Sequence, residues 1–285
     1  MKRYYPCQAS GSHVRTLDDN YYLIEADMIF CVAITLLKSE KLEQRVAGLN
    51  QINSVIRPTT TYYYNQPQRG LDKSEMVKRL RDMNVMEIIF GDKDSHIQLV
   101  MRGLELVKFL VQQREFSQQY LELVWAAAHR GEEQTKLEIY NIFRDVSGQL
   151  SITELESIIR LFSGIEPEKF ILREIECLSS LISFGNRPTQ AVQLQTQLFF
   201  DIAVQNRPYP KELVEVAIDK LIGTVRTAQE NALRLGYIQR AYDTLVEHRA
   251  SIQCIRIIAK ILEEVPSHRY SDNRTRYEVA SELID

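Results

Sequence analysis

The stretch of sequence that decides the fold runs from Ser95 to Val111 and reads SHIQLVMRGLELVKFLV. Its apolar residues recur at steps of three and four, the spacing that places side chains on one face of an α-helix. Ser95 precedes this stripe, and a serine in that position can accept a hydrogen bond from the first helical turn. The sequence therefore predicts an amphipathic helix with Ser95 as its N-cap. The members of the stripe are Ile97, Val100, Met101, Leu104, Val107 and Val111.

The same period continues along the chain, and capping residues mark several helix starts. Ser117 is a candidate N-cap, Ser151 and Glu154 form a capping-box pattern, and Pro167 fits the first turn of a helix that runs to about Phe184. Every second start is separated by about 35 to 43 residues, near the period of HEAT and armadillo repeats. The predicted starts lie near residues 95, 117, 132, 151, 167, 188, 210, 229 and 250.

The N-terminal third follows the same style, so the predicted fold class is all-α: an armadillo/HEAT-like α-solenoid of stacked helix pairs. Its predicted helices cover about 22–38, 40–57, 72–83 and 84–90. The predicted layout is a flexible N-terminus at 1–19, a repeat domain at 20–265 with a long loop at 58–71, and a polar tail or further repeat at 266–285. Because no polar capping repeat is recognisable after the last strong helix, we expect the chain to be part of a longer protein.

The composition agrees with a helical globular chain. Hydrophobic residues make up 45% and charged residues 26% of the 285 residues, which is ordinary usage for a protein with a sizeable core. Only 11 glycines and 8 prolines are present, so turns are few and the elements between them are long. The net charge of −3 argues against a nucleic-acid partner. No apolar run approaches the roughly 18 residues of a membrane span.

The four cysteines, Cys7, Cys31, Cys177 and Cys254, are far apart and form no CxxC motif. Neither a disulfide framework nor a zinc site is therefore predicted. The N-terminus lacks the apolar core of a secretory signal, and together these features favour a reducing, cytoplasmic compartment. All except Cys7 lie within predicted helices, where we expect them to be buried structural thiols.

The sequence contains no recognisable catalytic or metal-binding pattern. The five histidines are scattered, and no HExxH, GxGxxG, GxSxG or P-loop motif is present. His96 lies in a predicted first turn, where we expect a surface or capping role. We predict no catalytic residue, no metal site and no cofactor in this chain, because an enzyme here would need a site that leaves no motif.

Two features are candidates for binding. Tyr62, Tyr63 and Tyr64 lie in the predicted long loop, and tyrosine is favoured at interfaces; the alternative is that these rings pin the loop to the helices. Trp125 is the only tryptophan and is followed by three alanines, which would let a neighbouring helix approach closely. We interpret Trp125 as a packing site between repeats and not as part of a ligand pocket.

Several of these stretches resemble the non-catalytic helical region of the large ubiquitin-specific proteases of the fat-facets type. The resemblance covers about 84–265 and is carried by Ser95-His96, Phe109-Leu110, Ser117, Leu123-Val124-Trp125-Ala126-Ala127, Leu150–Leu155 and Tyr209–Leu213. It implies an armadillo-like scaffold upstream of a peptidase domain. The Cys box and His box of that peptidase are absent from this sequence, where the cysteines stand in YYPCQAS, MIFCVAI, EIECLSS and SIQCIRI.

The leading hypothesis is therefore a helical scaffold that binds other proteins, such as ubiquitin-pathway substrates or adaptors, within a large deubiquitinase. The resemblance implies that the parent protein is a deubiquitinating cysteine peptidase, although these residues carry none of its catalytic groups. The alternative is a free-standing HEAT-like adaptor of an unrelated complex. The sequence beyond Asp285 would separate the two, because a Cys box there would favour the first.

Overall fold

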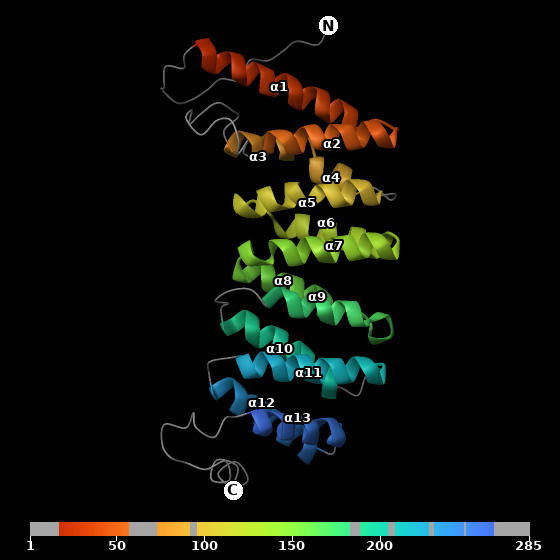
Figure 1. The fold of residues 1–285 in the computed structure, drawn as a ribbon, viewed down its shortest axis with the longest axis vertical. Helices are drawn as coiled ribbons and strands as arrows, with labels where there is room; N and C mark the ends of the chain where they lie inside the picture. Colours follow the sequence, from red (N-terminus) through yellow and green to blue (C-terminus); the bar gives the residue numbers. More distant parts are fainter. Residues whose placement is uncertain are drawn as a thin grey trace. The chain divides into compact units, whose positions relative to one another are not determined.

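The computed structural model describes residues 17–56, 73–91, 96–182, 189–204, 209–227, 231–247 and 249–264. Within these ranges the regular structure is helical and contains no strand, which confirms the predicted all-α class (Figure 1). The elements are α1 (Leu17–Leu37), α2 (Leu42–Ile56), α3 (Lys73–Asp82), α4 (Val85–Phe90), α5 (Ile97–Gln112), α6 (Gln118–Arg130), α7 (Glu133–Val146), η1 (Ser147–Gln149), α8 (Ile152–Ser163), η2 (Pro167–Lys169), α9 (Leu172–Ile182), α10 (Thr189–Val204), α11 (Lys211–Thr227), α12 (Asn231–Val246) and α13 (Ser251–Glu264).

The chain folds as two compact units, Met1–Ile139 and Tyr140–Asp285, and the division falls inside α7. In the second unit, α9 contacts α8, α10 and α11, while α11 contacts α10, α12 and α13. Helices that pack mainly on neighbours one and two positions along the chain are typical of repeat proteins. The single repeat domain expected over 20–265 stays a prediction.

Capping residues explain where two of the helices begin. The Tyr120 backbone N–H donates to Ser117 Oγ at the start of α6. At the start of α8, the Ser151 backbone N–H donates to Glu154 Oε2 and the Glu154 backbone N–H donates to Ser151 Oγ, which forms the predicted capping box. Each bond satisfies an N–H group that has no partner within its own helix.

The predicted helix start at Pro167 is wrong. Pro167 opens the three-residue helix η2, and α9 begins only at Leu172; Phe184, the expected end of the helix, lies outside the described residues. The extended backbone of Phe170 separates the two helices. Its ring is buried and packs edge-on against Tyr209 at 6.0 Å, so the helix is interrupted where this aromatic side chain enters the core.

In the first unit, Gly48 brings α2 into main-chain contact with α1. A Cβ atom at this position would lie 2.4 Å from the Ala33 carbonyl oxygen and 2.6 Å from the Leu37 nitrogen. Both are backbone atoms of α1, so only glycine allows this approach. Ala33, Leu37 and Leu49 are fully buried beside it. The contact between α1 and α2 is therefore as close as two helices can come at this point.

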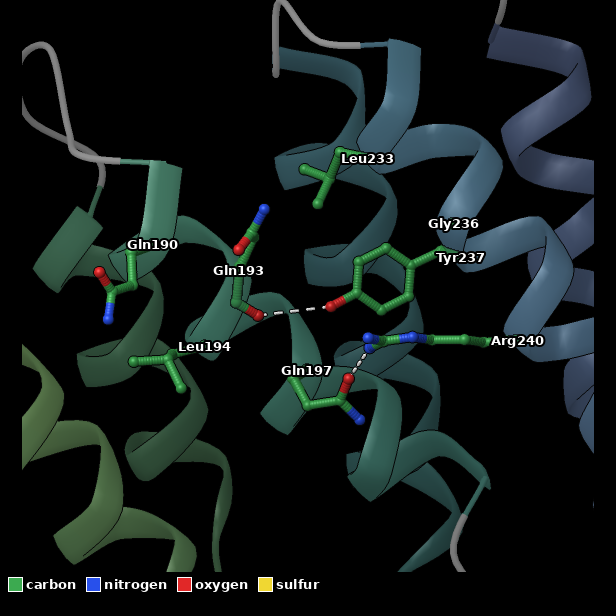
Figure 2. Close-up of a pocket in the computed structure, with 8 residues that line it drawn as sticks. All are labelled: Gln190, Gln193, Leu194, Gln197, Leu233, Gly236, Tyr237 and Arg240. Carbon is green, nitrogen blue, oxygen red and sulfur yellow. Dashed lines mark hydrogen bonds between the residues drawn. The ribbon is translucent and has the colours of Figure 1, made fainter.

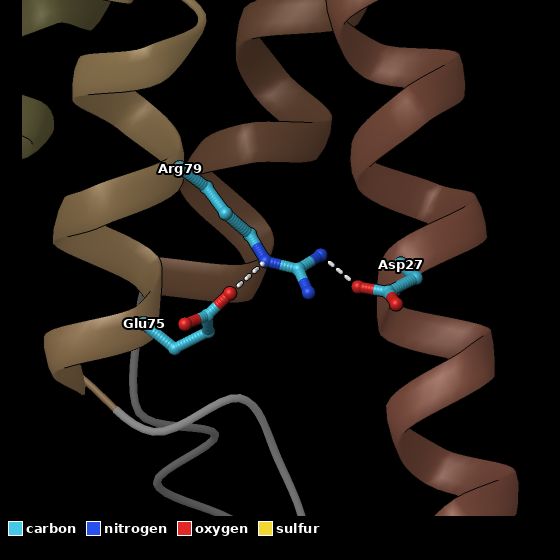
Figure 3. A network of polar contacts seen from close by, with 3 residues as sticks. All are labelled: Asp27, Glu75 and Arg79. Atoms are coloured by element: carbon cyan, nitrogen blue, oxygen red, sulfur yellow. Dashed lines mark hydrogen bonds and ion pairs between the residues drawn. The ribbon is translucent and has the colours of Figure 1, made fainter. Parts of the chain in front are cut away.

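Polar side chains join α3 to α1 in the first unit. Arg79 of α3 forms ion pairs with Asp27 of α1 and with Glu75 one turn earlier on its own helix (Figure 3). The Arg79 Nε to Glu75 Oε1 distance is 3.1 Å. Both carboxylates are partly exposed, so the pairs orient the two helices more than they stabilise them.

The short helix α4 is held by arginines from two other helices. Arg45 of α2 donates to the Ile88 carbonyl at 3.1 Å, and Arg130 of α6 donates to the Phe90 carbonyl at 2.7 Å. The last carbonyls of a helix have no partner within it, and cationic side chains satisfy them well. Asn84, immediately before α4, has a left-handed backbone with a φ of 54°.

Helix α5 corresponds to the amphipathic helix predicted from Ser95 to Val111, and it differs from that prediction in two respects. Its N-cap is His96, whose Nδ1 accepts from the Gln98 backbone N–H at 3.2 Å; Ser95 lies outside the described residues. Val100, Val107 and Val111 of the predicted stripe are fully buried, but the buried face also includes Leu99 and Leu106, and Met101 is 50% exposed. The physical reason is that α5 packs against both α2 and α4, which widens and turns its buried face.

A buried carboxylate organises the core of the second unit. Glu174 is 0% exposed and accepts hydrogen bonds from the Tyr140 hydroxyl at 2.9 Å and from the Ile171 backbone N–H at 3.0 Å. The second bond caps the N-terminus of α9, where a carboxylate is favoured. The Cys177 thiol lies 3.7 Å from the Tyr140 carbonyl. These bonds connect α9 to the residue at which the unit begins.

Candidate functional site

A hollow of about 410 Å³ lies between α10 and α12 of the second unit (Figure 2). We call it the α10–α12 groove. Its wall from α10 consists of Gln190, Gln193, Leu194 and Gln197, and its wall from α12 consists of Leu233, Gly236, Tyr237 and Arg240.

Helical spacing explains why these eight residues face each other. The positions on α10 follow the steps i, i+3, i+4 and i+7, and the positions on α12 follow the same steps. Residues so spaced lie on one face of a helix. The groove is thus two matching helix faces that meet without filling the space between them. Gly236 is exposed, and a Cβ atom there would meet no atom within 4 Å outside its own stretch of helix.

Tyr237 forms the fixed part of the groove. Its hydroxyl donates to the Gln193 backbone carbonyl at 3.4 Å, and its ring centroid lies 5.6 Å from that of Phe200. The Arg240 guanidinium carbon lies 5.2 Å from the same ring centroid, a distance at which a cation is attracted to an aromatic face. Burial raises the pKa of Tyr237 to about 12, so the phenol keeps its proton at neutral pH and remains a donor.

The polar side chains of the groove differ in how many hydrogen-bond partners they already have. Arg240 donates to Gln197 Oε1 (Figure 2). Gln197 Nε2 donates to Asp201 Oδ1 at 2.7 Å, so the Gln197 amide is occupied on both sides. Among the described residues, Arg240 forms no ion pair with a carboxylate, and the side-chain amides of Gln190 and Gln193 have no hydrogen-bond partner. The groove therefore offers two free amides and one positive charge beside an apolar hollow.

These groups suit binding and not bond-making. The groove contains no cysteine, histidine, serine or carboxylate among its lining residues, so it has no nucleophile and no general base. No group of three or more His, Cys, Asp or Glu side chains in the described ranges is placed to hold a metal ion. No described helix is long and apolar enough to cross a membrane.

The groove was not singled out from the sequence. Glutamines at i, i+3 and i+7 of a helix are typical of a solvent-exposed face, so they do not by themselves indicate a groove. The signal that could have found it is the repetition of one spacing on two helices separated by a single helix. Even that signal cannot show whether two such faces close on each other or leave a space.

The candidate binding residues identified in the sequence are not among the described residues that line the α10–α12 groove. Tyr62, Tyr63 and Tyr64 are outside the described residues, so a binding role for them stays a prediction. Trp125 is partly buried on α6, with its ring centroid 4.4 Å from that of His129 on the same helix. Ala127 and Ala128 beside it are buried, and α6 packs on α4. The printed ring contact is within one helix, so a packing role for Trp125 between repeats stays a prediction.

The cysteines behave as expected at two of the three described positions. Cys177 and Cys254 are buried, and burial raises the pKa of both thiols; the Glu174 carboxylate raises the pKa of Cys177 further. Thiols in this state are poor nucleophiles. The prediction that Cys31 is buried is wrong, because Cys31 is exposed. α1 buries the face that carries Phe30 and Ala33, and Cys31 lies outside that face.

Comparison with known proteins gives the family. The model of the ARM repeat of UBP24/USP9X/USP9Y matches residues 27–284. The chain belongs to this family. The match covers nearly the whole sequence, and it agrees with the resemblance to large ubiquitin-specific proteases that the residues around Trp125 carry. The armadillo-like repeat class predicted from the helix spacing is thereby confirmed.

Individual relatives of this ARM-repeat family are distant and much longer. Human ubiquitin carboxyl-terminal hydrolase 34 is 25% identical over 198 residues, which make up 65% of this chain and 6% of that protein. Mouse ubiquitin carboxyl-terminal hydrolase 9X is 19% identical over 135 residues, 46% of this chain and 5% of that protein. The chain thus matches only a small fraction of the length of these relatives. An engineered protein of solved structure aligns with a TM-score of 0.36 at 12% identity, covering 90% of this chain and 98% of that one, a likeness too low to support any argument.

Proposed function

We propose that this chain is a non-catalytic helical scaffold that binds other proteins, and that it does so as a segment of a large ubiquitin-specific protease. The observation that carries the proposal is the match of the ARM-repeat family to residues 27–284. Helical repeats bury a continuous core between neighbouring helices and leave long faces for partners. In this proposal the chain positions proteins, and a peptidase domain elsewhere in the parent protein breaks the bond to ubiquitin.

The partners in this proposal are proteins of the ubiquitin pathway, either substrates or adaptors, and the compartment is the cytoplasm. The scattered, unpaired pattern of the cysteines supports a reducing compartment. The α10–α12 groove supports binding over catalysis, because its polar groups are amides and a guanidinium.

The proposal is tested on the purified 285-residue chain. The chain is first incubated with a ubiquitin probe that carries a thiol-reactive C-terminus; we expect no covalent adduct, and an adduct would overturn the non-catalytic reading. The chain is then immobilised and incubated with a cytosolic extract, with a urea-unfolded and desalted sample as control. We expect proteins of the ubiquitin pathway to be retained by the folded chain alone, and retention of no such protein would contradict the scaffold role.

Sequencing the transcript past the codon for Asp285 tests the segment role, because a Cys box is expected there and a stop codon would favour a free-standing adaptor.

A further inference from the structure

We propose that the α10–α12 groove binds an extended peptide segment of a partner protein, one that carries an apolar side chain and, two residues later, a carboxylate. The inference rests on the proposed scaffold function and names a surface and a partner chemistry for it. Each part of the segment corresponds to a group that the groove presents.

The apolar side chain fits the hollow itself. A volume of about 410 Å³ lies beside Gly236, an exposed residue whose Cβ would meet no atom within 4 Å outside its own stretch of helix. Leu194, Leu233 and the ring of Tyr237 line the same space. Moving an aliphatic side chain from water into such a space is favourable because its apolar surface is removed from water. Because Phe200 and Arg240 hold the Tyr237 ring in place, the hollow exists before the ligand arrives.

The carboxylate fits Arg240. This guanidinium lies over the Tyr237 ring and donates to Gln197, but it has no ion pair with a described carboxylate. A guanidinium carries five N–H donors, so several remain for an anion. Gly236 and Arg240 are one helical turn apart, about 6 Å along α12. Alternate residues of an extended chain, which point to the same side, are about 6.6 Å apart. The spacing of two residues between the apolar and acidic side chains follows from this match.

The glutamines explain why the segment is extended and not helical. The side-chain amides of Gln190 and Gln193 are free, and each offers two donors and one acceptor. An extended segment exposes its backbone N–H and C=O groups to such amides, whereas a helix uses them internally. From Gln190 to Gln197 the row spans about 10 Å of α10, which equals roughly three residues of extended chain.

The experiment measures binding of defined fluorescent peptides to the full chain by fluorescence anisotropy. The probe is the amidated peptide GSLSDSG, and its comparators replace Leu by Ser or Asp by Asn. A further peptide, GSGSLSG with a free C-terminus, supplies the carboxylate from a chain end, and its amidated form is the control. We expect the Asp peptide to bind at least fivefold more tightly than the Asn and Ser peptides. Tighter binding of the free C-terminal peptide than of its amide, with no preference for Asp over Asn, would assign the carboxylate to a chain end instead of a side chain.

Variants assign the binding to the groove. Gly236→Leu fills the hollow and is expected to weaken binding of the Asp peptide at least tenfold, whereas Gly223→Leu on α11, at another glycine with open space around it, is expected to change nothing. Arg240→Gln is expected to abolish the preference for Asp over Asn, and Arg240→Lys to keep part of it. Gln193→Ala removes only an exposed side chain and is expected to weaken binding severalfold without affecting folding.

The outcomes separate this inference from the proposed function. Equal binding by Gly236→Leu and wild type, or no binding of any of these peptides at millimolar concentration, overturns the groove as a peptide site. If the folded chain still retains its proteins from the cytosolic extract, the scaffold function stands and its surface lies elsewhere. If the chain retains none, the proposed function itself fails.

Discussion

The contact between α1 and α2 and the groove between α10 and α12 both depend on a helical glycine, with opposite results. At Gly48 the missing side chain is replaced by the backbone of α1, with a main-chain oxygen 2.4 Å from where a Cβ would lie. Gly236 is exposed, its Cβ would meet no atom within 4 Å outside its own stretch of helix, and the residue lines a hollow of about 410 Å³. The same residue type thus allows close contact between one pair of helices and lines an open groove between another pair. A glycine in a repeat helix can therefore mark either the close approach of a neighbouring backbone or an unfilled space, and only the atoms around it distinguish the two.

The largest expected effect comes from adding one methyl group at the closed contact. Gly48→Ala forces α1 and α2 apart, because both atoms that it meets belong to the backbone and cannot rotate away. We expect the free energy of unfolding to fall by about 2–4 kcal/mol. Urea unfolding followed by circular dichroism measures this, with Gly223→Ala as the matched helical control. A variant as stable as the wild type would show that the two helices are not in main-chain contact.

The second prediction tests whether packing is equally tight in the unit that contains the groove. Glu174→Ala removes the acceptor of the Tyr140 and Ile171 hydrogen bonds and leaves a cavity in a fully buried place. We expect a loss of about 2–3 kcal/mol in the free energy of unfolding. Glu176→Ala, at an exposed carboxylate of the same helix, is the control and should change stability by less than about 0.5 kcal/mol. Equal effects of the two changes would contradict the buried role of Glu174.

The third prediction concerns Tyr237, whose ring lines the groove. Tyr237→Phe removes a long hydrogen bond to Gln193, so we expect a loss of at most about 1 kcal/mol at neutral pH. The folded pKa of Tyr237 is about 12, above its ordinary value of 10.0, so folding favours the protonated phenol. Its contribution is therefore complete below about pH 10 and is lost as pH rises towards about 12.

Because the folded pKa of Tyr237 is raised, its contribution to stability should fall at high pH, and this can be measured. Urea midpoints of wild type and Tyr237→Phe are compared at neutral pH and at about pH 11. The difference should shrink at the higher pH, because the wild type loses a stabilising term that the variant never had. A difference that grows with pH would mean that the phenol ionises more easily in the folded chain.

The smallest effect has the opposite sign to the first. Gly236→Ala places a methyl group in open space and removes the entropic cost of a helical glycine, so we expect stability to rise by about 0.5–1 kcal/mol. Thermal unfolding measures it against the wild type. A loss of stability would show that the added methyl group meets other atoms, and it would remove the contrast with Gly48.

The sequence predicted those parts of the fold that depend on local chemistry. Ser117 and the pair of Ser151 and Glu154 predicted helix starts correctly, because a capping bond is made within four residues. The α-helix start predicted at Pro167 was wrong, because a proline suits the first turn of a 3₁₀-helix as well as that of an α-helix. The position of Phe170 in the core, which is set by distant residues, decided between the two.

Burial was less predictable than helix position. Met101 was placed on the buried face of α5 and Cys31 among the buried thiols, and both are exposed. An apolar residue on a helix has several faces available, and the packing partners that choose among them are remote in sequence. The groove could not be predicted for the same reason, since the space beside Gly236 depends on how closely α12 approaches α10.

The short helix α4 shows how this chain acquires order over a distance. A helix of six residues has little stability in isolation. Its carbonyls are bound by Arg45, 43 residues before Ile88, and by Arg130, 40 residues after Phe90. Such a segment cannot form early in folding, because both arginines must first be brought near. Its amide protons should therefore exchange with solvent only when the surrounding unit opens as a whole, which makes α4 a reporter of cooperative unfolding in that unit.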